Sequence, residues 1–224
     1  ASPTPSVETI LHAILPFKYV DHTHADAVVT ISNTLDGEER IREIYGNRVV
    51  IVPYVMPGFD LAKEVGRLFS EMASDETEGM VLLNHGIFSF GSTARKSYDR
   101  MIDLVNLAEQ YLVSQNACDN EETVSNIKSN KIRNDVSQLR QKISSVAGNP
   151  VLLHLTNSQL GTSFSNRKDV EKIATRGPLT PDHVIRTKRI PMIGRDVEKY
   201  VKEYISYFNT HKTNAKEKKT MIDP

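Results

Sequence analysis

With 224 residues, 39% of them hydrophobic, the chain is long enough to bury a sizeable core in one large domain or in one domain with an appendage. Its 28 basic and 28 acidic residues cancel, so charge predicts no attraction to nucleic acid or to anionic lipid. The single cysteine, Cys118, excludes an internal disulfide framework and a cysteine-rich zinc site. Any metal would therefore be bound by histidine and carboxylate ligands.

The first residues, Ala-Ser-Pro-Thr-Pro-Ser, are typical of an internal loop, and no methionine precedes them. We therefore expect the sequence to be a piece of a longer protein. No export signal is visible at this start, and no apolar run is long enough to cross a bilayer. Together with the single cysteine, these features favour a cytoplasmic location.

Hydrophobic periodicity predicts that helices alternate with strands over residues 1–115, which indicates an α/β domain. Apolar residues at intervals of three and four indicate the helices, and short β-branched runs indicate the strands. The expected helices are 7–15, 37–46, 61–73 and one that Ser92 or Thr93 caps and that runs to about residue 113. The expected strands are 27–31, 49–55, 80–83 and 87–90.

The composition becomes polar at Ser114, and residues 116–134 are rich in Asn, Ser and Lys. We interpret residues 116–211 as a mainly helical extension and residues 212–224 as a charged tail or linker. The elements expected here are a helix or helical hairpin over 124–146, a strand over 151–155, and helices over 169–174 and 196–208.

A His-x-His pair, His22 and His24, is the most informative motif. If both lie on a strand, residues i and i+2 share a face, and the two imidazoles point to one place. His85 follows a strand expected to be buried, where residues of α/β sheets face the active crevice, and Gly86 allows the backbone to approach a ligand closely. Three neutral nitrogens are the usual set for a catalytic zinc, with the fourth position left for a carboxylate such as Glu8, water or substrate.

Plainer interpretations exist for each of these residues. An isolated His-x-His pair is more often two surface or packed histidines, so the third histidine and the carboxylate favour the metal site. Glu8 alone could be a helix-start charge favoured by the helix dipole. Ser6 and nearby amides could meet an anion at the same helix start. His12, one turn later, could orient Glu8 or simply pack.

Four motifs in order make this chain resemble the class II aldolase/adducin family over residues 2–113: Ser-x-Glu before a helix, His-x-His, Asn-His-Gly, and Gly-Ser-Thr before a long helix. Longer strings are similar to the aldolase half of bifunctional rhamnulose-1-phosphate aldolase/short-chain dehydrogenase proteins. These strings are Ser6–Ala13, Val20–His24, Val52–Phe59 and Thr180–Arg189.

The resemblance implies a three-layer α/β/α class II aldolase-like domain with a zinc ion bound by the three histidines. It implies that Glu8 binds the metal when substrate is absent and acts as the acid/base, and that Ser6 helps to bind the substrate phosphate. Val7 stands where the family often has a second serine, and the glycine-rich loops that normally precede this region are absent. No Gly-x-Gly-x-x-Gly of a dinucleotide-binding half occurs.

The implied reaction is the cleavage of a phosphorylated deoxyketose, such as L-rhamnulose 1-phosphate, to dihydroxyacetone phosphate and L-lactaldehyde. Zinc would stabilise the enediolate as a Lewis acid while the carboxylate moves the proton at carbon. The resemblance also implies a homo-oligomer with sites near subunit contacts. Two alternatives stay open, namely sugar-phosphate 4-epimerisation at similar zinc ligands and a non-catalytic adducin-like interaction module.

Other residues could contribute to this reaction. The polar string 182–189 could bind the substrate phosphate through Arg186 and Lys188, or it could be a solvated loop. Three tyrosines could protonate the leaving aldehyde: Tyr45, Tyr54 and Tyr98. For Tyr54, packing in a wall beside Pro53 is the favoured interpretation.

Overall fold

The computed structural model describes residues 6, 8–117, 129–156, 158–215 and 220–221. The chain forms two compact units. The first consists of residues 1–119 together with 178–189, and the second of residues 120–177 and 190–224. A short segment from the C-terminal half of the sequence therefore belongs to the N-terminal unit.

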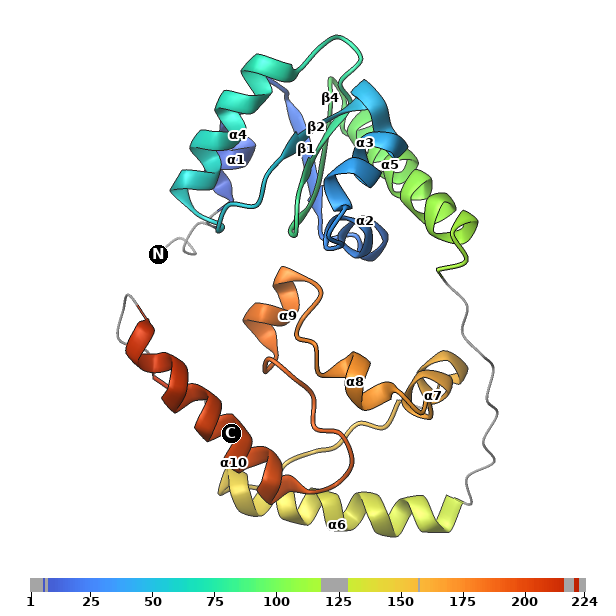
Figure 1. The fold of residues 1–224 in the computed structure, drawn as a ribbon, viewed down its shortest axis with the longest axis vertical. Coiled ribbons are helices and arrows are strands. Elements are labelled where there is room, and N and C mark those ends of the chain that lie inside the picture. Colours follow the sequence, from blue (N-terminus) through green and yellow to red (C-terminus); the bar gives the residue numbers. More distant parts are fainter. Residues whose placement is uncertain (1–5, 7, 118–128, 157, 216–219, 222–224) are drawn as a thin grey trace. The chain divides into compact units, whose positions relative to one another are not determined.

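The first unit is a three-layer α/β/α domain, which confirms the predicted fold class (Figure 1). Its four-stranded sheet has the order β1-β4-β3-β2. The β2–β3 pair is parallel, and β4 pairs antiparallel with both β1 and β3. The strands are β1 (Tyr19–Thr23), β2 (Val49–Val52), β3 (Gly79–Leu82) and β4 (Gly86–Gly91).

Helices cover both faces of this sheet (Figure 1). One face carries α1 (Thr9–Ile14) and α4 (Phe59–Met72). The other carries α2 (Asp26–Ser32), α3 (Gly37–Tyr45) and α5 (Ala94–Ser114). Because side chains alternate along a strand, β2 supplies both apolar layers. Val50 and Val52 pack with α1 and α4, and Val49 and Ile51 with the opposite cluster.

Several predicted elements are confirmed with small changes at their ends. The long helix α5 begins where a cap was expected, because the Thr93 side chain accepts a hydrogen bond of 3.1 Å from the Lys96 amide. The other strands and helices of residues 37–91 also lie where periodicity placed them, ending within a few residues of the expected positions.

The strand predicted over 27–31 is wrong, because these residues form α2. Val28, Val29 and Ile31 are all buried, and Val28 and Ile31 pack in the cluster with α3 and α5. This burial outweighs the modest preference of β-branched residues for strands. The strand in this part of the chain is β1, which precedes residues 27–31. His22 therefore lies in the strand, and His24 follows its last residue.

The second unit is helical, as expected, and contains little buried apolar surface. Among its described residues the buried ones are Val197 and Ser163. Its helices are α6 (Ser129–Ala147), α7 (Gln159–Ser165), α8 (Val170–Ala174), α10 (Val197–His211) and the 3-10 turn η2 (Lys212–Asn214).

The strand predicted over 151–155 is also wrong, because these residues have no regular secondary structure. Leu152 is 93% exposed, and an apolar run forms a strand only when another strand is available to pair with it. Parts of the predicted polar segment (118–128) and tail (216–219, 222–224), as well as Cys118, lie outside the described residues. None of the described helices is both long and apolar enough to cross a membrane.

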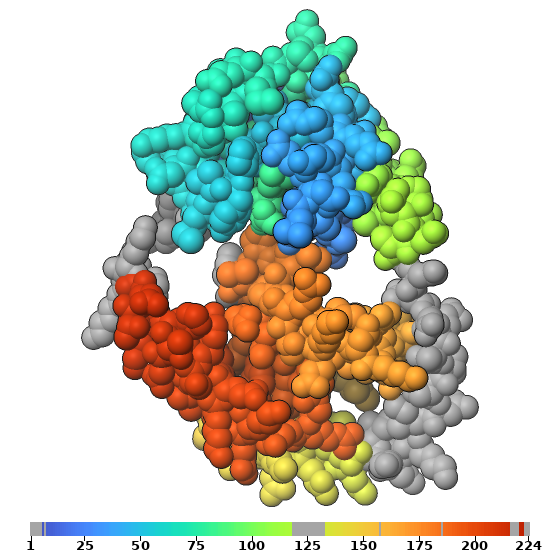
Figure 2. Space-filling view, in the orientation of Figure 1, coloured from blue at the N-terminus to red at the C-terminus, as the bar shows by residue number. Residues whose placement is uncertain are grey.

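Segment 178–189 contains α9 (Pro181–Arg186). It is joined to the rest of the first unit by hydrogen bonds, including one of 3.0 Å from Asn33 Nδ2 to the Leu179 carbonyl oxygen. In the space-filling view its orange atoms lie against the blue atoms of the N-terminal helices (Figure 2).

Candidate metal centre

His22 is fixed by two neighbours on β4. Its ring stacks on Phe88, its register partner, with centroids 4.0 Å apart and planes at 18°. Its Nδ1 lies 3.0 Å from the carbonyl oxygen of Ile87. Since a carbonyl oxygen only accepts, Nδ1 carries the hydrogen, and Nε2 presents a lone pair.

His24 lies just past the end of β1 and is fixed by a carboxylate instead. Its Nδ1 is 2.8 Å from Oδ2 of Asp182, the second residue of α9. The carboxylate accepts the Nδ1 hydrogen, so the His24 ring also turns an unprotonated Nε2 towards the interior.

His85 comes from the short connection between β3 and β4. The residue before it, Asn84, has a φ of 58°, a left-handed conformation that asparagine tolerates better than most residues. The His85 side chain is only 3% exposed. Burial is the main cause that lowers the pKa of His85, so its ring is neutral at neutral pH.

Gly86 determines how closely β4 approaches these rings. A Cβ at this position would lie 2.5 Å from the Thr23 carbonyl oxygen and 3.0 Å from atoms of both the His22 and His24 rings. Only glycine leaves this space free. At Gly86 the backbone of β4 comes close to β1 and to the two histidines, and the expected approach to a ligand stays a prediction.

Glu8, immediately before α1, completes the group. Its Oε1 lies 3.4, 3.9 and 3.0 Å from the Nε2 atoms of His22, His24 and His85 respectively. The interaction with the nearby His22 ring is the largest cause that lowers the pKa of Glu8 to about 2, outweighing the opposite effect of burial. Glu8 is therefore an ionised carboxylate at neutral pH.

The four side chains fit a divalent metal ion. Nε2 of His22 and Nε2 of His24 are buried and have no hydrogen-bond partner in the described part of the chain. One ligand atom from each of the four residues lies within 4.8 Å of the others. Ligands about 2.0–2.2 Å from a tetrahedral ion lie roughly 3.3–3.6 Å from one another. The distances of 3.4, 3.9 and 3.0 Å from Glu8 Oε1 to the three histidine nitrogens are close to this spacing. The carboxylate and the Nε2 atoms of His22 and His24 are acceptors, and a cation between them would give each of them a partner. His85 Nε2 donates a hydrogen bond of 3.0 Å to Glu8 Oε1, so it would bind the ion after its hydrogen moves to Nδ1.

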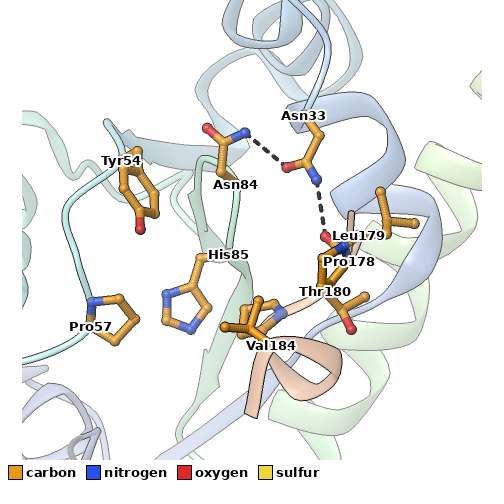
Figure 3. A pocket seen from close by; sticks show the side chains of 10 residues that line it. Asn33, Tyr54, Pro57, Asn84, His85, Pro178, Leu179, Thr180 and Val184 are labelled. Atoms are coloured by element: carbon orange, nitrogen blue, oxygen red, sulfur yellow. Dashed lines mark hydrogen bonds between the residues drawn. The ribbon is translucent and has the colours of Figure 1, made fainter. Parts of the chain in front are cut away.

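A cavity of about 550 Å³ adjoins the candidate metal centre at His85 (Figure 3). Asn33 holds two parts of its wall together: its side chain accepts a hydrogen bond from Asn84 (2.9 Å) and donates one to the Leu179 carbonyl oxygen. Most of the wall is apolar or weakly polar. The lining residues are Asn33, Tyr54, Pro57, Asn84, His85, Pro178, Leu179, Thr180, Pro181 and Val184.

The other predicted site residues lie in different places. Ser6 is close to Glu8, because its Oγ accepts a hydrogen bond of 3.2 Å from the Glu8 amide. Arg186 is exposed and lies 3.7 Å from Asp182. Lys188 is half-buried, and neither of these two basic residues is among those lining the cavity.

The histidine and the three tyrosines with more than one interpretation lie in different places. The His12 ring packs edge-on against Phe88, with centroids 5.4 Å apart. Tyr45 is buried, and its hydroxyl donates to the Leu104 carbonyl oxygen in the core. Tyr98 is exposed on α5, whereas Tyr54 lines the cavity. Tyr54 is thus the tyrosine among these three that faces this cavity.

Sequence reasoning missed the contacts of Asp182 and Asn33. Asp182 was considered only as part of a polar string, and its contact with His24 spans 158 positions. No local pattern reveals such a contact. The one available signal was that residues 180–189 take part in the family resemblance although they lie outside its core domain.

Two family models match the chain. The class II aldolase and adducin N-terminal domain matches residues 1–112, half of the chain, and the second domain of class II aldolases matches residues 130–224. The chain belongs to the class II aldolase and adducin family, which confirms the resemblance inferred from its motifs.

Individual relatives extend these matches. The uncharacterized oxidoreductase YuxG of Bacillus subtilis (strain 168) is 31% identical over 245 residues, covering 95% of this chain but only 34% of the relative. The N-terminal class II aldolase domain of a conserved protein from Thermoplasma acidophilum is 48% identical over 49% of both chains, with a TM-score of 0.45. A sugar-phosphate aldolase from Thermotoga maritima is 18% identical over 54% of this chain and 58% of that one, with a TM-score of 0.44. The chain thus spans about a third of the first relative and about half of the solved structures.

Proposed function

We propose that this chain is a zinc-dependent aldolase that cleaves a phosphorylated deoxyketose of the L-rhamnulose 1-phosphate type to dihydroxyacetone phosphate and L-lactaldehyde. One observation carries the proposal: the convergence of three histidine nitrogens and the Glu8 carboxylate next to a cavity. A histidine-rich set with one carboxylate suits zinc better than it suits magnesium or calcium, which prefer oxygen ligands.

In this proposal His22, His24 and His85 would hold the zinc ion through Nε2. When bound, zinc would supply a Lewis acid that stabilises negative charge developing on the substrate oxygens. The hydrogen bond from His22 Nδ1 to Ile87 and that from His24 Nδ1 to Asp182 keep these rings in the tautomer that leaves Nε2 available.

Glu8 would take a proton from, or return it to, the reacting carbon of the substrate. Its pKa of about 2 makes it a weak base while it contacts the histidines. If the carboxylate turns away from His22 and His85 towards substrate, the interactions that depress its pKa are lost, and its basicity rises. A carboxylate that exchanges these contacts for substrate could therefore act as the acid/base.

The cavity supports a substrate of this size and kind. About 550 Å³ lies within the range of sites for small molecules. Leu179 and Val184 offer an apolar wall that would suit the terminal methyl group of a deoxyketose. Ser6, Arg186 and Lys188 are the proposed ligands of the substrate phosphate. Tyr54, which lines the cavity, is the tyrosine that we propose as the proton donor to the leaving aldehyde.

We further propose that the protein is a homo-oligomer located in the cytoplasm. The support for assembly is the family resemblance, and the support for location is the use of a single cysteine. The alternatives to cleavage are a sugar-phosphate 4-epimerase with similar zinc ligands and an adducin-like interaction module. An adducin-like interaction module, unlike the two enzymes, would not require the metal ligands.

The test begins with elemental analysis of the purified chain, its His22→Ala/His24→Ala variant and a His12→Ala control. We expect about one zinc per chain in the wild type and the control, and almost none in the double variant. Loaded wild-type protein should then release dihydroxyacetone phosphate from L-rhamnulose 1-phosphate. Epimerised sugar phosphate without cleavage would support the epimerase instead. A wild type that binds no zinc even when zinc is supplied would contradict the metal-dependent proposal.

A further inference from the structure

We propose that Asp182 is a positioning residue that orients His24 as a metal ligand, so that the metal centre is complete only when segment 178–189 is in place. This inference rests on the metal centre of the proposed function. It assigns a role to a residue that lies far from the other members of the centre in the sequence.

The first argument is a contrast between two of the histidines. His22 lies within β1, and the main-chain carbonyl of Ile87 accepts its Nδ1 hydrogen. His24 lies beyond the last residue of that strand, and the side-chain carboxylate of Asp182 accepts its Nδ1 hydrogen. Asp182 thus accepts the Nδ1 hydrogen of His24, as the Ile87 carbonyl of the sheet accepts that of His22.

The geometry of the contact is that of a strong, charge-assisted hydrogen bond. The separation of 2.8 Å between His24 Nδ1 and Asp182 Oδ2 is typical of an N–H group donating to a carboxylate. The opposite ring atom, Nε2, is buried without a hydrogen-bond partner among the described residues and lies 3.9 Å from Glu8 Oε1. The carboxylate therefore fixes both the tautomer and the direction of the ring.

The second argument is that Asp182 is itself held in place. Asn33 binds the Leu179 carbonyl oxygen, and Thr180, which is only 4% exposed, starts α9. The Thr180 hydroxyl lies 2.6 Å from Nδ1 of His183. These contacts fix the start of α9 on the first unit, so Asp182 reaches His24 from an ordered backbone.

A carboxylate behind a metal-binding histidine raises the basicity of the ligand and removes its rotational freedom. Loss of such a partner weakens metal binding by about 10- to 100-fold. A helix-start charge without this role would change stability only slightly and would leave zinc affinity unchanged.

The experiment is chelator competition for Zn²⁺ with the wild type and with Asp182→Ala, Asp182→Asn and Asp60→Asn. Asp60 is the matched control, because it is also a first-turn acid of a helix in the first unit, and within the described residues its ion pair is with Lys63. We expect Asp182→Ala to weaken zinc binding up to about 100-fold and Asp182→Asn, which keeps an acceptor oxygen, by about 10-fold. Asp60→Asn should bind within about two-fold of the wild type.

A second readout needs no metal. Nitrogen-15 spectra of the imidazoles should show His24 as the Nδ1–H tautomer in the wild type and a mixture in Asp182→Ala. If Asp182→Ala does not fold, the nearly isosteric Asp182→Asn decides the question.

Zinc binding within two-fold of the wild type in a folded Asp182 variant overturns the role of Asp182 while leaving the proposed function intact. A wild type that binds no zinc overturns both proposals.

Discussion

The two units differ most in how much apolar surface each encloses. In the first unit, buried clusters fill both sides of the sheet, and the four residues of the candidate metal centre lie in β1 or directly beside α1, β1, β3 and β4, which pack in these clusters. In the second, Val197 is the buried hydrophobic residue among those described, and leucines such as Leu152 and Leu160 are exposed. A precise arrangement of side chains requires a packed support, so the difference explains why the site is built on the first unit.

Segment 178–189 likewise depends on the packed support of the first unit. Its helix, α9, has six residues, too few to be stable alone in water. It is ordered because Asn33 and His24 bind it to the first unit. The C-terminal half of the sequence therefore contributes to the site through segment 178–189, which packs in the first unit.

The sharpest test of the comparison is one substitution made in both units. Leu104→Ala in α5 removes a fully buried side chain and should lower the free energy of unfolding by about 3 kcal/mol. Leu160→Ala in α7, where the leucine is 70% exposed, should change it by less than about 0.5 kcal/mol. Urea denaturation followed by circular dichroism measures both. Equal losses would break the comparison and show that Leu160 is buried in solution.

A second test concerns the tight packing beside the candidate metal centre. Gly86→Ala places a Cβ 2.5 Å from a backbone oxygen of β1, so we expect a loss of about 1–3 kcal/mol and weaker zinc binding. Gly66→Ala in α4 is the control, because its nearest neighbour would be a side-chain atom at 3.4 Å. That helical alanine should leave zinc binding unchanged and stability equal or slightly higher. Unchanged zinc affinity in Gly86→Ala would contradict the close approach.

The smallest expected effect compares two tyrosines that each donate to a backbone carbonyl. Tyr45, in the first unit, donates to Leu104, and Tyr200, in the second, to Ile190. Burial raises the pKa of Tyr45 well above its usual value, and it also raises that of the more exposed Tyr200. At pH 8 we expect Tyr45→Phe to cost about 1 kcal/mol and Tyr200→Phe less.

The pH dependence of this pair follows from the direction of the shifts. The unfolded chain ionises its tyrosines near pH 10, whereas folded Tyr45 stays protonated. Its contribution is therefore fully present below about pH 10 and is lost as the pH rises further. Denaturation midpoints at pH 8 and 10.5 should converge between the wild type and Tyr45→Phe. Convergence that is as large for Tyr200→Phe would remove the distinction between the units.

The sequence by itself determined the features that depend on local pattern. The amphipathic spacing of residues 61–73 and the cap at Thr93 are read from neighbouring residues, and the structure confirms both elements. The motif order was equally informative, because Glu8 and the three histidines, although dispersed in the sequence, come together as expected. Their functional roles remain proposals.

Only the tertiary structure decided features that depend on distant partners. The β-branched residues 27–31 form a helix because α3 and α5 bury them. The apolar residues 151–155 form no strand because no neighbouring strand pairs with them. The cavity wall brings residues between 33 and 85 together with residues between 178 and 184, and the contact between His24 and Asp182 spans 158 positions. Local periodicity records which face of an element is apolar, but the element that will cover that face is specified by the packing of the whole domain.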